Sequence, residues 1–254
     1  MAATWVKRAL LEVQGFVLLS AEAARATFTR PFYAREFVEQ LDAIGVGSLV
    51  VVLLTGLFTG AVLALQSGLT LDQFGARALV GRLVGSTMVK ELGPVLTALM
   101  LTGRVGSGIA AELGSMGVTE QLNALRALGT DPVRKLVVPR VLAGVTMMPV
   151  LTVVSDTVGV LGGGLIAVWE LGVSPNAYWQ SLLDGLIIED VWMGLIKPIF
   201  LGFVITTIGC YVGLGVRGGT QGVGRATTRA VVAASVAVLA VDYFVTKALV
   251  TLIY

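Results

Sequence analysis

Lys90 and Glu91 are the residues of this sequence whose types and position best suit chemistry. They stand side by side in VKELGPVLTALM, just before Gly93-Pro94 and an apolar run that continues to Met100. Charges beside an apolar run are costly unless they face a cavity, a partner or water. Because lysine donates and glutamate accepts hydrogen bonds, the pair suits a polar group held at the mouth of an apolar groove.

Glu91 also has a structural interpretation. If Gly93-Pro94 begins a helix, the carboxylate lies near the positive end of the helix dipole. Glu91 then caps that helix, or it pairs with a nearby cation such as Lys90 or Arg82. The sequence leaves the binding role and the structural role open.

Three further charges, Arg104, Glu112 and Asp242, lie in or beside apolar runs. Arg104 and Glu112 are two helical turns apart on one face, which indicates a charge network. Asp242 is placed deeper, and we predict that it pairs with Arg104 or Thr246 rather than lining a transport path. All three are predicted to be structural charges.

The sequence lacks the residues that several kinds of catalytic centre require. The chain has no histidine, so the commonest general base and metal ligand are missing, and Cys210 is alone in an apolar run. No G-x-x-x-x-G-K-[ST] motif occurs, so the chain has no P-loop for ATP. The G-x-G-x-x-G match at 213–218 follows an apolar run rather than a strand. We expect no catalytic residue, no metal site and no cofactor in this chain.

The elements that hold these charges are expected to be membrane helices. The chain is 56% hydrophobic and 13% charged, with a mean hydropathy of +0.88, whereas soluble domains carry about 25% charged residues. A span needs about 20 residues. The apolar runs predict an all-α integral membrane protein with five transmembrane helices, at 44–66, 92–109, 136–169, 194–216 and 230–254.

The remaining segments complete one domain, 1–254. Val6, Leu10, Val13 and Val17 share a helical face, which indicates an amphipathic elbow helix in the membrane interface, although a soluble helix on a partner gives the same pattern. We therefore divide the domain into an elbow region, 1–43, and a transmembrane domain, 44–254. Segment 71–89 is interrupted by charges and is predicted to be a short connection.

Positive charges predict the orientation. The segment before the first span carries five Lys or Arg residues, and the loop before the fifth span carries three. The section between the second and third spans also carries five when Arg104 and Arg140 on its flanks are counted. The loop between the third and fourth spans has none and carries four acids. The N-terminus is therefore predicted to be cytoplasmic and the C-terminus to lie outside, although Arg77, Arg82 and Lys90 weaken the bias.

Glycines recur in small-xxx-small pairs, which allow close contact between membrane helices. The pairs are Gly56/Gly60, Gly81/Gly85, Gly159/Gly163 and Gly209/Gly213. Packing within one subunit is the favoured interpretation, and a subunit interface is the alternative.

A short cytoplasmic helix is predicted in GVTEQLNALRALGTDP. Thr119 suits its N-cap and Glu120 its first turn, Gly129 suits its C-terminal cap, and Asp131-Pro132 opens the next helix. Such a short helix is marginal alone in water and needs a docking surface. That surface belongs either to its own membrane domain or to a cytoplasmic partner.

Three stretches give the sequence a family resemblance. The stretch KELGPVLTALMLTGRVGSGIAAELGSMGVTEQLNALRALGTDPVRKLVVPRVLAG resembles the signature region of MlaE/YrbE permeases, and GLFTGAVLALQ and GVGRATTRAVVAASVAVLAVDYF also match. These permeases are membrane subunits of ABC transporters that move phospholipids and work with MCE-domain proteins. The resemblance implies a homodimer in a bacterial inner membrane, with ATP and Mg bound by separate cytoplasmic ATPase subunits. It implies roles in outer-membrane lipid asymmetry or in lipid trafficking between membranes.

The resemblance also implies roles for individual residues. A coupling helix from Thr119 to Leu128 would sit in a groove of the ATPase, with contacts from Thr119, Glu120, Gln121, Leu122, Leu125 and Arg126. A phospholipid cavity at the dimer interface would open toward the MCE protein and be lined by Leu63, Leu71, Phe74, Lys90, Glu91 and Leu92. Family members usually have arginine at position 90 and often tyrosine at 74, so charge is kept at the first and a hydroxyl is lost at the second.

Other functions remain as alternatives. A scaffold would anchor the ATPase and the MCE protein without moving lipid. An ion-coupled lipid carrier would need paired acids and inverted repeats, but only one deep acid, Asp242, is evident and no repeat is seen. A membrane enzyme acting on lipids would need an Asp, Glu or Lys site. Nothing in the sequence indicates a nucleic-acid partner.

Overall fold

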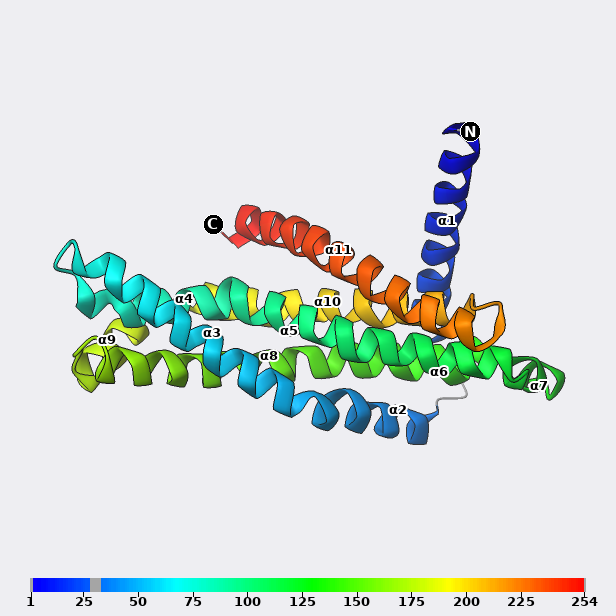
Figure 1. The fold of residues 1–254 in the computed structure, drawn as a ribbon, viewed down its shortest axis with the longest axis horizontal. Coiled ribbons are helices and arrows are strands. Elements are labelled where there is room, and N and C mark those ends of the chain that lie inside the picture. The colour runs from blue at the N-terminus through cyan, green and yellow to red at the C-terminus, as the bar shows by residue number, and fades with distance from the viewer. Residues whose placement is uncertain (1, 28–32, 254) are drawn as a thin grey trace. The chain divides into compact units, whose positions relative to one another are not determined.

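The computed structural model describes residues 2–27 and 33–253, and these residues form helices joined by short turns, with no strand among them (Figure 1). This confirms the all-α prediction. The α-helices are α1 Ala2–Ala26, α2 Ala34–Leu41, α3 Gly47–Asp72, α4 Val80–Thr87, α5 Gly93–Leu101, α6 Ser107–Val118, α7 Gln121–Ala127, α8 Val138–Trp169, α9 Pro175–Gly185, α10 Ile188–Leu214 and α11 Gly219–Ile253. A 3₁₀ turn, Arg77–Leu79, precedes α4, and π-helical turns lie at Asp42–Val46, Met88–Leu92, Thr102–Gly106 and Val133–Val137.

Five helical stretches of the described chain are long and apolar enough to cross a membrane, so this is a multi-pass membrane protein. They run over Ala34–Asp72, Arg77–Val118, Val133–Trp169, Ile188–Leu214 and Gly219–Leu252. The predicted number of spans is confirmed, but three predicted starts lie ten residues or more too late. The first stretch begins at Ala34 rather than at 44. The fifth stretch begins 11 residues before 230, at Gly219, and the second begins at Arg77 rather than near 92.

The second stretch begins early because Gly93-Pro94 does not start a helix. The amide of Gly93 donates to the Met88 carbonyl, five residues back, so a π-helical turn joins α4 to α5 without a break. A proline inside a helix lacks one amide donor, and a local π turn accommodates the loss. Segment 71–89 is therefore largely helical, and its prediction as a mere connection is wrong.

The residues cluster into two compact units. Unit 1 contains 1–44, 101–145 and 202–237, and unit 2 contains 45–100, 146–201 and 238–254. The predicted cytoplasmic segments fall in unit 1 and the predicted outer segments in unit 2. The chain alternates between the units at each long helix, as five alternating spans require. The division into 1–43 and 44–254 stays a prediction.

Glycines set the closest helix packing in unit 2. A Cβ added to Gly60 would overlap the backbone of Gly159, and one on Gly56 would press on Ser155. Gly81 is equally crowded by the carbonyl of Tyr178. The predicted packing role within one subunit is therefore confirmed for these glycines.

Replacing Gly60 by alanine is expected to destabilise the protein by about 1–3 kcal/mol, because the new methyl group forces α3 away from the backbone of Gly159. Gly108→Ala is the matched control, since a Cβ there has no neighbour within 4 Å. Chemical denaturation in mixed micelles measures both variants. Equal stability of the two would contradict the close packing.

Helix α9 was missed in the interval 170–190. Ser174 caps it by accepting a hydrogen bond from the Ala177 amide at 3.3 Å, and Pro175 opens its first turn. It packs on α4, with Tyr178 buried and its hydroxyl donating to the Val160 carbonyl at 2.8 Å. Burial raises the pKa of Tyr178, so the phenol stays neutral.

Unit 1 holds the N-terminal helix α1, which confirms that the elbow region is helical. Phe16 packs edge-on against Tyr211, and Glu12 pairs with Arg229 at 2.6 Å. Leu10 is 64% exposed and belongs to the predicted apolar face. The side chain of Val6 and residue Arg30, which the predictions also used, lie outside the described residues.

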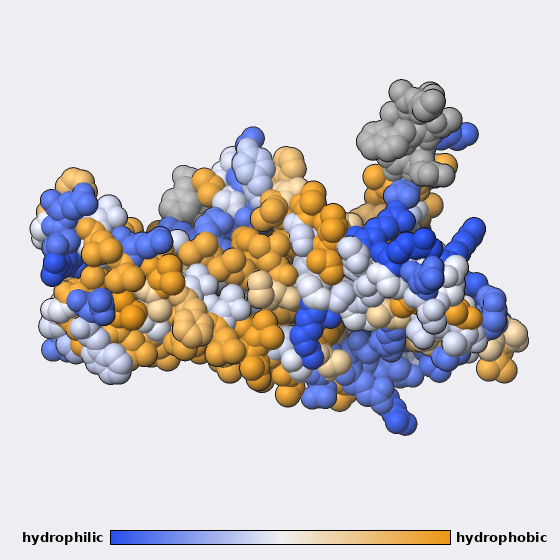
Figure 2. Space-filling model, viewed as in Figure 1, coloured by the Kyte–Doolittle hydropathy of each residue, from blue (hydrophilic) through white to orange (hydrophobic). Residues whose placement is uncertain are grey.

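Large apolar side chains remain exposed on the long helices. Val50, Phe58, Val236 and Phe244 are each more than 60% exposed. Figure 2 shows hydrophobic residues over much of the face that it displays. Such surface is unusual for a soluble monomer and suits contact with lipid.

Candidate functional site

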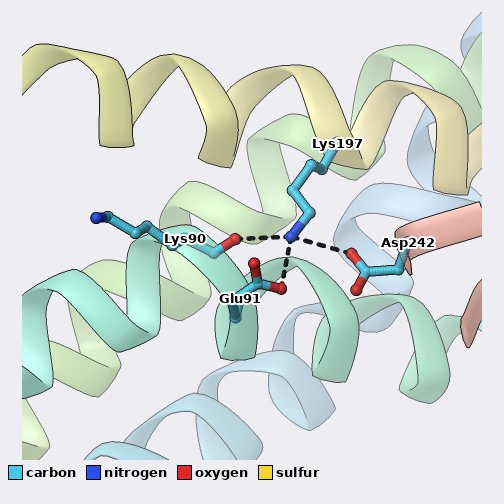
Figure 3. Close-up of polar contacts among 4 residues, drawn as sticks. All are labelled: Lys90, Glu91, Lys197 and Asp242. Atoms are coloured by element: carbon cyan, nitrogen blue, oxygen red, sulfur yellow. Dashed lines mark hydrogen bonds and ion pairs between the residues drawn. The ribbon is translucent and has the colours of Figure 1, made fainter. Parts of the chain in front are cut away.

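A buried lysine organises the polar centre of unit 2. Lys197, on α10, is fully buried, and its ammonium lies 2.6 Å from Glu91 Oε2 and 3.1 Å from Asp242 Oδ1 (Figure 3). It also donates to the Lys90 carbonyl at 2.9 Å. One cation therefore joins α10, α11 and the π turn that carries Lys90 and Glu91.

The local sequence explains the third contact. Pro94 has no amide to donate to the Lys90 carbonyl four residues earlier. Lys197 donates to this carbonyl instead. The Lys90 carbonyl, left without an amide donor by Pro94, thus becomes part of the polar centre. Single π-helical turns inside α-helices often occur at functional sites.

A second ion pair lies beside the first. Lys90 Nζ is 2.7 Å from Asp190 Oδ1, and the Asp190 side chain is only 1% exposed. We call Lys90, Glu91, Asp190, Lys197 and Asp242 the charged cluster. Buried charges of this kind are tolerated only when they are paired.

The charged cluster is exposed unevenly. Lys197 and Asp190 are buried, whereas the Glu91 side chain is 42% exposed and that of Lys90 is 33% exposed. Their buried partners therefore hold the two half-exposed charges in place. Lys90 and Glu91 are neighbours in the sequence, but the Lys90 ammonium points away from the Glu91 carboxylate (Figure 3). One half-exposed cation and one half-exposed anion are the two charges that a zwitterionic group needs.

These pairings correct the expected partners. Glu91 was predicted to cap a helix or pair with Lys90 or Arg82, but it lies inside a continuous helix and pairs with Lys197. Asp242 was predicted to pair with Arg104 or Thr246, and its partner is also Lys197. Asp242 therefore has an ionic partner, but not an expected one, and its purely structural role stays a prediction.

The charges of unit 1 form a separate group. Arg104 donates to the Ala43 carbonyl at 3.0 Å, and Glu112 pairs at 2.6 Å with Arg140, whose side chain is 5% exposed. Arg104 and Glu112 line one cavity of about 250 Å³. The structure therefore brings these two residues together and adds Arg140 as the partner of Glu112.

The apolar residues predicted for the lipid cavity lie in unit 2. Leu63, Leu71 and Leu92 are half-buried and pack on one hydrophobic core that includes Met88. Phe74 is 77% exposed beyond the end of α3. Leu92 and Glu91 adjoin in the π turn, so an apolar side chain borders the charged cluster.

The predicted coupling helix is α7, Gln121–Ala127. Thr119 does not cap it, because its hydroxyl donates to the Ser115 carbonyl at the end of α6. Glu120 holds the N-cap position with φ of 61°, and its carboxylate accepts a hydrogen bond from Asn123. The expected N-cap is therefore shifted by one residue.

The other end of α7 agrees with the prediction. Gly129 has φ of 73°, and its amide donates to the Arg126 carbonyl while the amide of Thr130 donates to Leu125. This is the Schellman arrangement that glycine favours. Asp131 then caps the next helix by accepting from the Val133 amide at 2.9 Å.

One face of α7 docks on its own unit and another is open. Leu122 is 6% exposed and α7 packs on α6. Gln121 and Arg126 are exposed, Leu125 is half-buried, and Leu128 just after the helix is 79% exposed. Leu122 therefore supports docking of α7 on the membrane domain of this chain. The exposed Gln121, Arg126 and Leu128 leave a second face for a cytoplasmic partner.

Sequence reasoning missed four of these features. The sequence places Lys197 at the start of the fourth predicted span and Asp190 among the four acids of the loop before it, and it indicates no partner for either. Leu128 was the last residue of the predicted coupling helix but was given no contact with the ATPase, and the buried Asp156 in α8 was not considered. For Lys197 and Asp156 the available signal was a single charge within an apolar run.

Comparison with known proteins identifies the family of this chain. The family described as Permease MlaE matches residues 37–248. The chain belongs to the MlaE permease family. A probable ABC transporter permease protein of Rickettsia felis is 44% identical over 92% of this chain and 91% of its own length.

Two further relatives carry more specific names. The intermembrane phospholipid transport system permease protein MlaE of Haemophilus influenzae is 38% identical over 91% of this chain and 88% of its own. The chloroplastic protein TRIGALACTOSYLDIACYLGLYCEROL 1 of Arabidopsis thaliana is 36% identical over 82% of this chain and 60% of its own. Membership of the MlaE permease family confirms the prediction of a permease subunit rather than a catalytic enzyme.

Proposed function

We propose that this MlaE-family chain is the membrane subunit through which an ABC transporter moves phospholipids between a membrane and an MCE-domain lipid-binding protein. The name of the Haemophilus influenzae relative supports phospholipid as the substrate. The observation that carries the proposal is the half-exposed pair Lys90 and Glu91, held by buried partners and bordered by Leu92.

The charged cluster explains how such a lipid is held. Lys90 attracts the phosphate of a head group, and Glu91 attracts an ammonium such as that of ethanolamine. Leu63, Leu71 and Phe74 supply apolar surface for the acyl chains. Because Lys197 and Asp190 fix the two charges, little conformational freedom is lost on binding.

Energy comes from partners rather than from this chain. Two copies of the chain form a homodimer, and cytoplasmic ATPase subunits that hold ATP and Mg bind α7 and neighbouring residues. ATP-driven closure presses the α7 helices together and narrows the lipid cavity, so that lipid passes to the MCE protein. The assembly works in the bacterial inner membrane, in lipid asymmetry of the outer membrane or in trafficking between membranes.

The orientation follows the charges of the loops. The N-terminus is cytoplasmic and the C-terminus periplasmic, because basic segments lie on the cytoplasmic side of membranes. The alternation of the chain between unit 1 and unit 2 supports this topology.

Leu63→Trp is expected to reduce co-purifying phospholipid by about half or more, because the indole fills space meant for an acyl chain. Val50→Trp is the matched control on α3, at a residue 67% exposed and outside the predicted cavity. Mass spectrometry of lipids in equal amounts of folded protein gives the measurement. Unchanged lipid content in Leu63→Trp would count against the cavity.

A scaffold and an ion-coupled carrier remain the competing functions. A scaffold binds its partners without a lipid in its charged cluster, and a carrier moves lipid without an ATPase. Genes for an ATPase and an MCE protein beside this gene would favour the ABC permease over the carrier. Lipid binding in the purified complex separates the permease from the scaffold.

A further inference from the structure

A second polar feature of unit 2 is the carboxyl group of Asp156, which the charged cluster does not include. Asp156 lies in α8 and is 9% exposed. Its Oδ1 lies against the Cα of Gly93 and has no hydrogen-bond partner among the described residues. An unpaired buried carboxylate is costly in a membrane helix, so this group needs a proton or a donor from outside the chain.

Asp156 lines a cavity of about 320 Å³. Its walls come from α8, α9, α10 and the π turn Met88–Leu92, and they are almost wholly apolar. The lining residues are Val89, Val153, Asp156, Thr157, Val160, Leu161, Trp179, Leu186, Val191, Gly194 and Leu195. The volume lies at the lower end for ligand pockets, and one charge within an apolar wall is the pattern of a specific binding site.

The surroundings of the cavity indicate where its ligand comes from. Val153, Leu161 and Val191 line it and are each more than 40% exposed, and all three belong to membrane-spanning stretches. The cavity therefore opens on a surface that the bilayer covers. A ligand dissolved in the bilayer can enter this cavity with its polar group toward Asp156 and its apolar part toward the lipid.

We propose that this cavity binds a cationic single-chain amphiphile whose ammonium group donates to Asp156. A charge-assisted hydrogen bond to the carboxylate removes the cost of the unpaired acid. An anionic head group is excluded because Asp156 is the one charged residue of the lining. The cavity is too small for a diacyl phospholipid, so this site is separate from the proposed transport path and does not depend on it.

Fluorescence of Trp179 tests the proposal, because this residue lines the cavity and is 42% exposed. The chain has four tryptophans. Trp5, Trp169 and Trp192 are replaced by phenylalanine in the full chain, which is placed in lipid nanodiscs. The probes are brominated dodecylamine and brominated dodecanoic acid, whose chains quench tryptophan at short range.

We expect saturable quenching by the amine, with a half-saturating concentration at least about tenfold below that of the acid. Asp156→Asn is expected to weaken binding of the amine at least about tenfold and to leave the acid unchanged. Equal quenching by both probes, or an unchanged affinity for the amine in Asp156→Asn, would overturn the proposal.

A second pair of variants keeps the test decisive if Asp156→Asn does not fold. Val153→Phe fills the cavity, whereas Val150→Phe alters an exposed valine on the same helix that does not line it. We expect only Val153→Phe to abolish saturable quenching by the amine. The same quenching curve in both variants would show that the amine binds elsewhere and would contradict the assignment.

Discussion

Replacing Lys197 by methionine is expected to lower the free energy of unfolding by about 3–5 kcal/mol, the largest effect that we predict. Methionine fills a similar volume, but it leaves Asp242 without its cation and Glu91 without the partner that holds it. It also removes the donor to the Lys90 carbonyl, which Pro94 cannot replace. Denaturant titration of the purified protein in mixed micelles provides the measurement.

A triple variant separates the electrostatic cost from lost packing. Adding Glu91→Gln and Asp242→Asn to Lys197→Met removes both uncompensated carboxylates. At least about half of the lost stability is expected to return, because breaking a buried ion pair costs more than removing it whole. If Lys197→Met is as stable as the wild type, or the triple variant is the least stable, Lys197 does not stabilise the fold by pairing with Glu91 and Asp242.

The second large effect is expected at Leu128. Leu128→Asp should reduce ATP-driven lipid transfer about tenfold or more and leave the fold intact, because this exposed side chain is free to bury itself in the ATPase. Leu183→Asp, at another exposed leucine, on α9, is the matched control. Transfer is measured in proteoliposomes, and circular dichroism checks the fold.

The structure also shows which substitutions can test coupling to the ATPase without disturbing the fold. The implied ATPase contacts of Glu120 and Leu122 predict that Glu120→Lys and Leu122→Asp each uncouple the ATPase without unfolding the spans. Leu122 is buried where α7 packs on α6, so an aspartate there disrupts the fold of unit 1. If Leu128→Asp and Leu183→Asp transfer lipid equally well, the exposed end of α7 is not the coupling surface.

Local patterns predicted the number of spans and the end of α7 well, but not where the spans begin. Apolar runs longer than about 20 residues leave few alternatives in a chain this hydrophobic. Gly129 and Asp131-Pro132 act through bonds to near neighbours, so their roles are visible in the sequence. The Ser174-Pro175 signal for α9 was equally local and was overlooked.

The charged cluster was harder to predict because its pairs are distant in sequence. Lys197 lies more than 100 positions from Glu91, and no periodicity links them. Gly93-Pro94 was misleading for a related reason. It resembles the start of a helix, and only the π turn and the distant Lys197 explain how the helix continues through it.

ATP-driven transfer of a fluorescent phospholipid tests the proposed function most directly. Proteoliposomes contain this chain with its ATPase, and a soluble MCE-domain partner is the acceptor. We predict transfer that requires both ATP and this chain. Transfer is expected to be lost when Lys90, Glu91 and Asp190 are replaced by methionine, glutamine and asparagine, while ATP hydrolysis continues because no buried acid is left without its cation. Hydrolysis of ATP by the intact complex without any transfer of phospholipid would contradict the proposed function.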